Sequence, residues 1–360
     1  MGFDSLSFVN FRNLKDGEIA LGAPQVLLIG ENGQGKTNLI EAVHLLCVAS
    51  SFRENKEPAF FRSPQSELAI AGVFSDNSQR RTLGFRIVPG QHKEIRLDGK
   101  LIADRKDLLG QVPCVCFVQQ DIEFVAGSPE ARRRFFDQTL LLCFPSLVDT
   151  HRDYRRVLRS RNFVLKQAQA ELLDAYDPQL ARHGLELSRA RARLVDDFNR
   201  HFSPLFREIT GWDGPVLIRH LPSWADLPDE ASVLRRLESL RARDLAFGTT
   251  TSGPHRDLFS YIAGGQEFVS RASTGERRIC SLILRVAQAT LLAQNSGRRP
   301  VLLVDDVLLE LDPGRKRAII DRLPEYQQSI FTLLPDENFL PYKRPDALVL
   351  RVKDGGCTPW

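Results

Sequence analysis

Two features that the chain lacks exclude whole classes of protein. Its longest apolar runs, such as "LLLCF" and "VLLV", are too short to span a bilayer, so we expect no membrane segment and no membrane partner. The N-terminal stretch "MGFDSLSFVNFRN" has no basic segment followed by a long apolar core, which excludes a secretory signal. A cytoplasmic protein is therefore predicted.

Cysteine is also sparse, and it is not arranged for a metal or for disulfides. Six cysteines occur in 360 residues, and no CxxC pair or histidine cluster accompanies them. Most have apolar neighbours, so the pattern predicts reduced structural thiols in a reducing compartment. The six are Cys47, Cys114, Cys116, Cys143, Cys280 and Cys357.

Acidic residues are scarce in one part of the chain. The formal net charge of +4 says little by itself, but residues 131–170 hold nine basic residues against three acids. A local excess of this kind makes a polyanion a plausible partner.

The order of predicted elements indicates α/β segments on both sides of a helical insertion. In the first 125 residues, short strands alternate, and an apolar strand at 24–30 precedes a helix at 36–49. Residues 129–210 have the apolar spacing of helices, with Pro129, Pro145 and Pro178 at the predicted starts. After a mixed stretch to about 240, a hairpin strand, a helix and the buried strand of "RPVLLVDDV" follow.

The stretch "VLLIGENGQGKTNLIEAV" matches a P-loop between an apolar strand and an apolar-periodic helix. Its glycines let the backbone wrap closely around phosphate oxygens, and the helix dipole adds a favourable partial charge. Lys36 is predicted to bridge the β- and γ-phosphates, and the Thr37 hydroxyl to bind Mg²⁺. The predicted nucleotide-binding residues are Gly30, Glu31, Asn32, Gly33, Gln34, Gly35, Lys36, Thr37 and Asn38, and Arg12 in "NFRN" is a further candidate.

A pair of acids at the end of a buried strand supplies the second requirement of such a site. In "RPVLLVDDV", Asp305 is the expected carboxylate on the Mg²⁺ side, and Asp306 is placed to orient or deprotonate the attacking water. The alternative, a capping or salt-bridged pair, is disfavoured because adjacent buried acids are costly unless a cation or donor uses them. Asp305, Asp306 and Lys36 are therefore the predicted catalytic residues.

A second anion-binding helix start lies in "RASTGERRIC", about 30 residues before Asp305. The stretch "LELD" (309–312) follows the acids, and nearly 270 residues separate them from the P-loop. These features resemble an ABC-type ATPase head, in which the serine-glycine helix of one subunit caps the γ-phosphate bound by another. The alternative is an ordinary helix N-cap by Ser273 or Thr274.

Over nearly its whole length the chain resembles the RecF family of bacterial recombination mediators. The segments "NFRNL", "SSFR", "GSPEARRRFFD", "YDPQLARHG", "SGPHRD" and "VLLVDDVLLELD" occur with the P-loop in that family's order and spacing. The resemblance implies ATP as the nucleotide, an ATP-dependent homodimer, weak DNA-stimulated ATPase activity and binding to DNA. It also implies that Ser273 and Gly275 complete the partner subunit's site, and that RecR- and RecO-like mediators are partners.

The implied fold is an α/β ABC-type P-loop ATPase head with an inserted, mainly helical second lobe. We expect the head to comprise 1–128 and 241–360, and the helical arm to comprise 129–240. Three positions depart from the family pattern. Gln119-Gln120-Asp121 replaces proline followed by an acid, although Gln120 remains a candidate Mg²⁺ ligand; Leu258 and Thr332 stand where an acid and, in transporter ATPases, a switch histidine are usual.

Arginine stripes on two predicted helices are the expected DNA contacts, because sequence-independent binding needs little more than phosphate partners. The first stripe shares one helix face, with acids near enough to pair with some members, so a solvated face is the alternative. "GSPEARRRFFD" has its own alternative as a structural helix start, and His255 either contacts nucleotide or partner or caps its hairpin. The predicted DNA-binding residues are Arg132, Arg152, Arg155, Arg156, Arg159, Arg189 and Arg193, with Arg182 in the second stripe.

Three other functions compete with a DNA-repair ATPase. The ATP-binding subunit of a membrane transporter would carry a full LSGGQ-type signature and a switch histidine, whereas this chain has "ASTGERR" and Thr332. An SMC-like head would need hundreds of heptad residues between its halves. A metabolic kinase would have no task for the second helix start. ATP-induced dimerisation and DNA-stimulated hydrolysis distinguish these alternatives.

Overall fold

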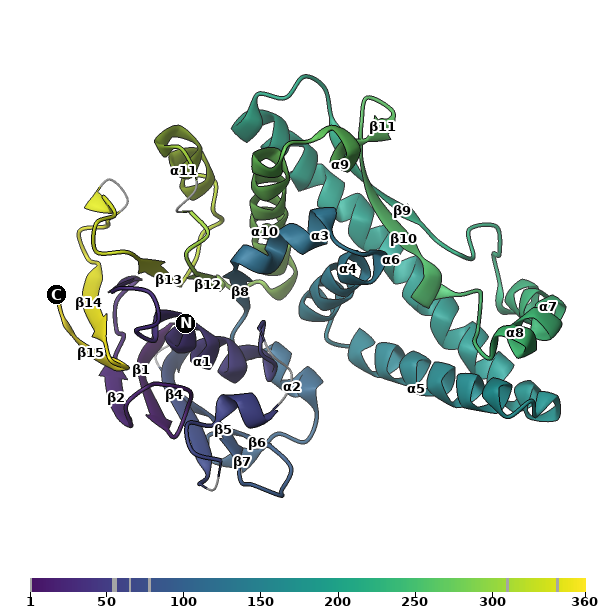
Figure 1. Cartoon of the computed structure of the whole chain (residues 1–360), viewed down its shortest axis with the longest axis horizontal. Coiled ribbons are helices and arrows are strands. Elements are labelled where there is room, and N and C mark those ends of the chain that lie inside the picture. The colour runs from purple at the N-terminus through teal and green to yellow at the C-terminus, as the bar shows by residue number, and fades with distance from the viewer. Residues whose placement is uncertain (1, 54–56, 65, 77–78, 309–310, 341–342) are drawn as a thin grey trace. The chain divides into compact units, whose positions relative to one another are not determined.

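The computed structural model describes residues 2–53, 57–64, 66–76, 79–308, 311–340 and 343–360. The chain forms two compact units, Met1–Asp121 with Leu282–Trp360, and Ile122–Ser281. Figure 1 shows strands and helices in both. The predicted α/β class is confirmed.

The first unit contains two six-stranded sheets. One is antiparallel, in the order β2 (Gly17–Ala20), β1 (Phe3–Val9), β4 (Leu68–Asp76), β5 (Gln79–Ile87), β6 (Glu94–Leu97) and β7 (Lys100–Leu101). The other has the order β15 (Gly356–Pro359), β14 (Leu348–Lys353), β3 (Gln25–Ile29), β13 (Gln328–Leu333), β12 (Val301–Val304) and β8 (Cys114–Phe117). Its strands are parallel except β15.

Burial explains the composition of the parallel strands. Every residue of β3, β8, β12 and β13 is buried, as expected for strands covered on both faces, and their sequences "QVLLI", "CVCF", "VLLV" and "QSIFTL" are mostly apolar. Helix α1 (Lys36–Val48) contacts β4 and β5 of one sheet and β8, β12 and β13 of the other. The shorter elements of this unit are η1 (Glu57–Phe60), α2 (Arg105–Leu109), η2 (Gln119–Ile122) and α11 (Pro313–Ile320).

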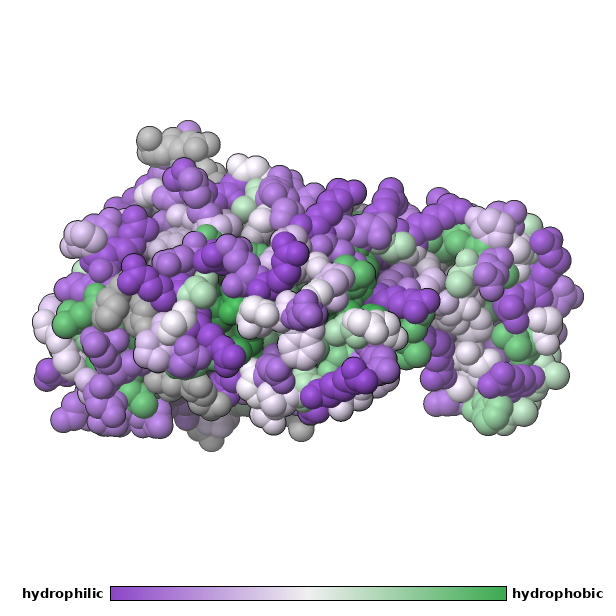
Figure 2. Space-filling model, turned by 90° about the horizontal axis from the view of Figure 1, so that it is seen from above, coloured by the Kyte–Doolittle hydropathy of each residue, from purple (hydrophilic) through white to green (hydrophobic). Residues whose placement is uncertain are grey.

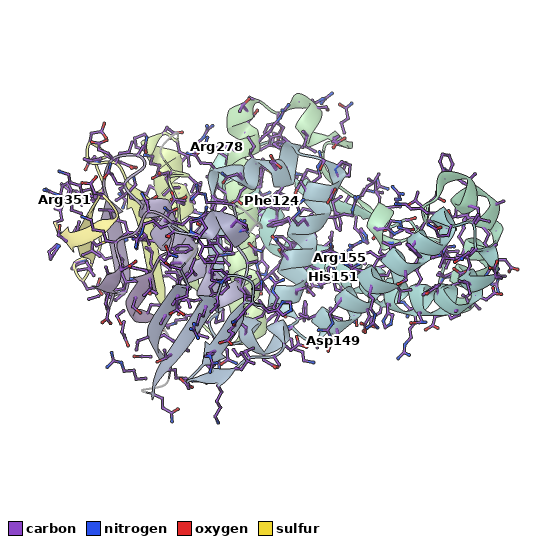
Figure 3. All side chains as sticks on the ribbon, turned by 60° about the horizontal axis from the view of Figure 1, so that its bottom comes forward. Phe124, Asp149, His151, Arg155, Arg278 and Arg351 are labelled. Carbon is purple, nitrogen blue, oxygen red and sulfur yellow. The ribbon has the colours of Figure 1, made fainter. Side chains whose placement is uncertain are left out.

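The second unit is mainly helical. Its elements are α3 (Glu123–Ala126), α4 (Pro129–Cys143), α5 (Leu147–Lys166), η3 (Ala170–Leu172), α6 (Leu173–Thr210), α7 (Glu230–Ser239), α8 (Arg241–Phe247), η4 (Pro254–Arg256) and α9 (Phe268–Arg271). Strands β9 (Val216–Leu221), β10 (Leu258–Ala263) and β11 (Gln266–Glu267) form a three-stranded sheet. Helix α10 (Thr274–Ser296) begins in this unit and ends in the first. Figure 3 shows Asp149, His151 and Arg155 along α5.

The boundaries of the second unit differ from the expected arm of 129–240. Residues 122–128 and 241–281 were expected in the head, but the contacts place them with the helices. The physical reason is long-range pairing, because β10 pairs with β9 along six residues from Leu258↔Leu221 to Ala263↔Val216. Buried ion pairs add to it, since Arg161 on α5 contacts Asp244 on α8 at 2.7 Å.

Helix starts were predicted with mixed success. Pro129 occupies the first turn of α4, and Ser128 caps it, as its position before an apolar helix predicts. Pro178, in contrast, lies inside α6, so the predicted start there is wrong. The helix begins earlier because Leu173 is buried with Val164 and Leu165, and this apolar contact fixes its first turn.

Two predictions drawn from what the sequence lacks can be compared with the fold. All six cysteines are free thiols, and five of them are buried, with Cys357 partly exposed. None of the helices in the described part of the chain combines the length and apolar character needed to cross a bilayer. In the view of Figure 2 hydrophilic residues cover most of the surface, with scattered hydrophobic ones between them.

Candidate nucleotide-binding site

The predicted P-loop connects the buried end of β3 to the first turn of α1. At Gly30 a β-carbon would lie 2.3 Å from the carbonyl oxygen of Val352, so that position has room only for glycine. Gly35 precedes the helix with φ +111°, and its β-carbon would meet Leu14 at 2.9 Å. Close packing and backbone conformation therefore both require the glycines of the motif.

Lys36 lies across this loop and is almost completely buried. Its Nζ donates to the carbonyl oxygens of Gly30 at 2.6 Å and Glu31 at 3.2 Å. The ammonium group is thus held inside the loop, beside the amides that open α1. A positive charge and free amides at a helix start are the groups that phosphate prefers.

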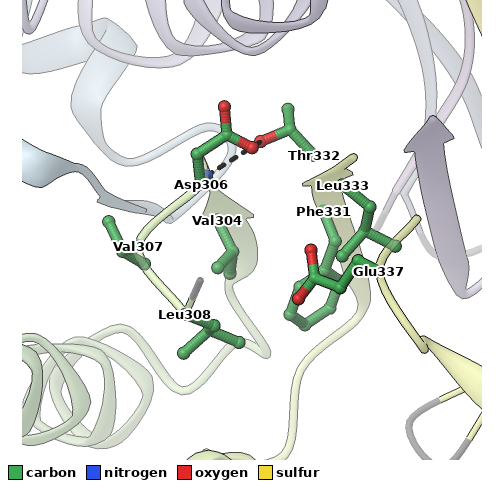
Figure 4. Close-up of a pocket in the computed structure, with 8 residues that line it drawn as sticks. All are labelled: Val304, Asp306, Val307, Leu308, Phe331, Thr332, Leu333 and Glu337. Carbon is green, nitrogen blue, oxygen red and sulfur yellow. Dashed lines mark hydrogen bonds between the residues drawn. The ribbon is translucent and has the colours of Figure 1, made fainter. Parts of the chain in front are cut away.

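The two predicted acids follow β12, whose neighbour β13 separates it from β3 in the sheet. The Thr37 hydroxyl donates to Oδ1 of Asp305 at 3.0 Å. Thr332 Oγ1 lies 3.1 Å from the same oxygen and 2.8 Å from Oδ1 of Asp306, and it accepts from the Asp306 amide at 2.8 Å (Figure 4). The structure therefore brings Thr37, Asp305 and Asp306 together, and it adds Thr332.

Burial and the Asp306 carboxylate raise the pKa of Asp305 to about 6, while the hydrogen bond from Thr37 acts in the opposite direction. A carboxylate that is costly to ionise favours a nearby cation. The Thr37 hydroxyl and the Asp305 carboxylate are oxygen ligands of the kind that Mg²⁺ uses beside substrate phosphates. The residues present therefore fit the implied Mg²⁺ ion.

A cavity of about 10 Å³ lies beside Asp306 and Thr332. Val307, Leu308 and Glu337 line it as well, and Figure 4 shows the apolar side chains on the side away from Asp306. Its size approaches that of a single water molecule. The surroundings of Asp306 are therefore close-packed on this side.

A turn at the C-terminal end of the chain supports the P-loop, and no sequence motif marks this contact. The amide of Asp354 donates to Oε1 of Gln34 at 2.6 Å, and the amide of Gly355 donates to the Gln34 carbonyl oxygen at 3.0 Å. Asn13 adds a third contact, from its Nδ2 to the Gly33 carbonyl oxygen at 2.9 Å. Glycine after aspartate in "KDGG" is a signal for the turn itself, but it does not tell which segment the turn contacts.

Arg12 does not point freely toward the P-loop. Its Nη2 and Nε donate to the buried carboxylate of Glu41 at 2.8 and 3.0 Å, and its Nη1 donates to the Ala59 carbonyl oxygen. Arg53, from "SSFR", is exposed; it donates to Oδ1 of Asn38 at 2.8 Å and lies 3.8 Å from the Glu41 carboxylate. Of these two arginines, Arg53 is the one next to the predicted nucleotide-binding residue Asn38, and sequence reasoning missed it.

The segment Gln119-Gln120-Asp121, which departs from the family pattern, contains both exposed and buried residues. Gln119 and Gln120 are exposed on η2, and within the described chain Gln120 makes no hydrogen bond that ties it to Asp305. Asp121 is buried and forms an ion pair with Arg285, with contacts of 2.6 and 2.9 Å. Gln120 as a metal ligand thus stays a prediction.

In the second unit, the start of α10 is exposed and internally capped. The Ser273 amide donates to Oε2 of Glu276 at 2.7 Å, and the Glu276 amide donates to Ser273 Oγ at 3.3 Å. This reciprocal arrangement is a capping box, which is the ordinary alternative for this helix start. Gly275 is open to solvent, with no atom within 4 Å of the position that a β-carbon would take. An exposed start of this kind is also accessible to a second subunit.

The predicted DNA-binding arginines fall into three groups. Arg132 is largely buried and donates to the Phe259 carbonyl oxygen at 3.0 Å and to Glu267 at 3.1 Å, which favours the structural alternative for that helix start. Arg152 and Arg156 pair with Asp149 and Asp153, while Arg189 donates to the Pro228 carbonyl oxygen. The exposed side chains with no carboxylate within ion-pair distance among the described residues are Arg155, Arg159, Arg182 and Arg193.

Side chains of the "SGPHRD" segment form hydrogen bonds within the second unit. The His255 ring lies 2.7 Å from the Tyr154 hydroxyl and 2.9 Å from the Thr250 carbonyl oxygen. Asp257 accepts from Arg191 at 2.8 Å. Burial lowers the pKa of His255 to about 4, so the ring is neutral at physiological pH. These contacts favour the structural role of His255 over a nucleotide contact.

Comparisons with known proteins show the family to which the chain is related. A family model described as "RecF/RecN/SMC N terminal domain" matches residues 3–343. The DNA replication and repair protein RecF of Treponema pallidum (strain Nichols) is 36% identical over 98% of this chain and 99% of its own length. The RecF of Synechococcus sp. (strain JA-2-3B'a(2-13)) is 32% identical over 99% of this chain and 97% of its own.

Solved structures are also similar to this chain. The recombination mediator protein RecF with ATP, described as part of the RecFOR pathway, has a TM-score of 0.90 and 26% identity, covering 100% of this chain and 99% of that one. An SMC head bound to the C-winged helix domain of ScpA has a TM-score of 0.56 and 14% identity, covering 99% and 97%. That second likeness concerns the fold alone.

Proposed function

Because the chain belongs to the RecF/RecN/SMC N-terminal domain family, we propose that it is an ATP-dependent DNA-binding protein of recombinational repair and replication-fork maintenance. It dimerises when it binds ATP, hydrolyses ATP weakly, and helps load recombinase on gapped DNA. The observation that carries this proposal is the contact of Thr37 with Asp305 beside a buried Lys36. It joins the two halves of an ATP site from opposite ends of the chain.

Each residue of this site has a chemical task in the proposal. Lys36 leaves the carbonyl oxygens of its own loop and binds the β- and γ-phosphates. Thr37 and Asp305 would hold Mg²⁺, which supplies charge neutralisation for the phosphates when it is bound. Asp306 orients the attacking water. The Thr332 hydroxyl holds Asp306 in place, because it contacts both the backbone amide and the Oδ1 atom of Asp306. Hydrolysis is proposed to be slow because one chain supplies only half of the contacts to the γ-phosphate.

The other half comes from the start of α10 in a second subunit. Ser273 and Gly275 are exposed there, and the amides of a helix start bind anions. Within one chain the Ser273 hydroxyl and amide both donate to the Glu276 carboxylate. A γ-phosphate from the partner's site would replace this carboxylate as the acceptor. ATP then stabilises the dimer, because it binds the dimer more tightly than the monomer. Hydrolysis removes this difference in affinity, so the dimer dissociates.

DNA binding is assigned to the second unit. Arg155 and Arg159 on α5 and Arg193 on α6 are exposed, and a duplex backbone needs only such phosphate contacts. Affinity should fall steeply as salt rises, because each phosphate contact releases counterions. Since solved relatives are described within the RecFOR pathway, RecR- and RecO-like mediators are the proposed protein partners. No observation on this chain favours the transporter alternative.

Light scattering with and without Mg²⁺–ATP tests the proposal. The native chain should change from monomer to dimer with ATP, whereas Ser273→Arg should stay monomeric. Ser273→Thr is the matched control, since threonine also caps a helix and keeps the hydroxyl. A native chain that stays monomeric with bound ATP would reduce the start of α10 to an ordinary cap. ATPase rates with and without duplex DNA then separate dimerisation from hydrolysis.

A further inference from the structure

Two phenylalanines at one end of the second unit are exposed to solvent. Phe163, near the end of α5, is 63% exposed, and Phe247, the last residue of α8, is 68% exposed. The neighbouring apolar residues Val164 and Leu165 are buried in a cluster with Leu173. The fold therefore has an apolar interior at this end, and it leaves these two rings outside.

The two helices that carry the rings meet at this end. Leu245 of α8 packs against the cluster of Val164, Leu165 and Leu173. The β-carbon position of Gly248, directly after Phe247, lies 3.3 Å from Cγ of Lys166. Lys166 follows Phe163 by three residues and therefore shares its face of α5. The end of α8 that carries Phe247 consequently lies beside the face of α5 that carries Phe163 and Lys166.

This surface is basic. Arg159 precedes Phe163 by four residues on the same helix face, and it continues the stripe from Arg155. Arg243 holds its guanidinium carbon 5.8 Å from the Phe247 ring centre. Within the described chain, Arg159, Lys166 and Arg243 have no carboxylate within ion-pair distance. We call Arg159, Phe163, Lys166, Arg243 and Phe247 the arm-end surface.

The nearby acids do not neutralise these charges. Asp174, at the start of α6, is already paired with Arg241. Glu171 and Glu238 are exposed acids of the neighbouring elements η3 and α7. The cations of the arm-end surface, together with Arg155, outnumber them. These cations and the two exposed rings suit a partner that is anionic and offers flat apolar groups.

We propose that the arm-end surface binds single-stranded nucleic acid, with unpaired bases stacked on Phe163 and Phe247. A single strand combines a regular anionic backbone with flat π-faces, and exposed aromatic rings in a basic groove are how proteins bind it without sequence preference. A duplex keeps its bases stacked inside and would leave both rings in water. The inference deepens the proposed DNA binding and rests on it, since α5 then continues from backbone contacts to base contacts.

Fluorescence anisotropy with the full chain tests this, using a labelled oligothymidylate of about 12 nucleotides, within the site sizes of single-strand binders. Phe163→Ala and Phe247→Ala should each weaken binding at least about five-fold, which is about 1 kcal/mol and the lower limit expected for one stacked base. Phe163→Trp should retain affinity. Leu172→Ala, which removes an exposed apolar side chain without a ring, is the control that should bind normally.

An abasic oligomer of the same length supplies the decisive comparison. It keeps the phosphates but has no bases, so native protein and Phe→Ala variants should bind it equally weakly. Equal affinity of native protein for the two oligomers would overturn the proposal. So would Phe→Ala variants that bind oligothymidylate normally but lose self-association or protein binding, since the surface would then be a protein contact.

Binding to a blunt duplex, measured in parallel, separates this inference from the function on which it rests. Phe163→Ala and Phe247→Ala should leave duplex affinity unchanged, whereas Arg155→Ala should lower it. If duplex binding is absent in the native chain, the proposed DNA function itself fails. If duplex binding is present but oligothymidylate binding does not depend on the rings, only the arm-end assignment fails.

Discussion

The hydroxyl of Thr37 donates a hydrogen bond of 3.0 Å to Oδ1 of Asp305, although 268 positions separate the two residues in the chain. The contact follows from the sheet order β3-β13-β12, because parallel strands bring their carboxyl ends to one edge. These strand pairings hold the Thr37 hydroxyl beside the Asp305 carboxylate, and groups that the fold already holds in place lower the ordering cost of binding.

Thr37→Val should weaken Mg²⁺-dependent ATP binding about ten-fold or more. The substitution keeps the shape of the side chain but removes the donor to Asp305 and a predicted Mg²⁺ ligand; a hydrogen bond to a charged group contributes about 1.5–3 kcal/mol. Titration with a fluorescent ATP analogue, with Mg²⁺ and with chelator, measures this. Thr37→Ser should retain affinity. An equal loss with chelator would contradict a role toward the metal.

Gly355→Ala should disturb the P-loop from the opposite end of the chain. The φ of Gly355 is +75°, and its β-carbon would lie 2.0 Å from the Asn13 carbonyl oxygen, so the turn must move away from Gln34. ATP affinity should fall by about an order of magnitude or more, as expected when a supporting contact of a site is lost. The same titration measures it.

Gly265→Ala is the matched control for that substitution. Its φ of +79° imposes the same backbone strain, but no atom lies within 4 Å of the new β-carbon. It should cost about 1 kcal/mol of stability and leave ATP affinity unchanged. If both variants bind ATP like the native chain, the C-terminal turn does not support the P-loop.

The parts of the site whose geometry is local could be predicted from the sequence. The P-loop needs a strand, a glycine-rich turn and a helix in succession, and β3, the turn with Gly30 and Gly35, and α1 follow one another in that order. The acids at the end of a fully apolar strand were also recognisable, because burial makes Asp305 costly without a partner. A short range of residues determines each of these features.

Features that depend on distant pairings were missed. The Asp354–Gly355 turn reaches the P-loop only because β14 pairs with β3 from the far end of the chain. The compact unit extends past the expected boundary at 241 for the same reason, since nothing in "LFSYIA" shows that it pairs with β9. Arg12 was selected by its position in "NFRN", yet its guanidinium is held by Glu41, a contact that charge spacing does not reveal. Leu309 and Glu310 of the "LELD" stretch lie outside the described residues.

Acid should destabilise the second unit through His255. Burial lowers the pKa of this ring to about 4, while an unfolded chain has about 6.5. The unfolded state therefore takes up a proton first, so stability is complete above about pH 6.5 and is lost as the pH falls toward 4. The difference of about 2.5 pKa units corresponds to about 3 kcal/mol at most. Burial also lowers the pKa of His44 to about 4, so acid should destabilise the first unit in the same way.

Urea unfolding at several pH values between about 7 and 5 measures this. His255→Asn should lower the stability at neutral pH, because contacts with Tyr154 and Thr250 are lost, but its stability should then depend less on pH than that of the native chain. The exposed His92→Asn is the control, and its pH dependence should parallel the native curve. Parallel curves for all three proteins would refute the assignment.

Arg161→Met should be among the most destabilising single changes in the second unit. The side chain is completely buried, and it donates to Asp177 at 2.8 Å and to Asp244 at 2.7 Å. Methionine fills similar space but, among the described residues, leaves the buried Asp244 carboxylate without a cation and Asp177 with Arg241 alone, which costs about 3–5 kcal/mol. Thermal and urea unfolding of the full chain measure the loss. Arg159→Met, two residues earlier and exposed, should change stability by less than about 0.5 kcal/mol.

A second substitution distinguishes lost packing from an unpaired charge. Asp177 keeps Arg241, whereas Asp244 loses its only cation within the described chain. Adding Asp244→Asn to Arg161→Met removes this unpaired carboxylate charge, so the double variant should recover part of the lost stability. Asparagine still offers an oxygen to the Thr251 amide, which donates to Asp244 at 2.9 Å in the native chain. If the losses of stability caused by Arg161→Met alone and by Asp244→Asn alone simply add in the double variant, the cost of Arg161→Met comes from packing. The ion pair to Asp244 then does not stabilise the unit.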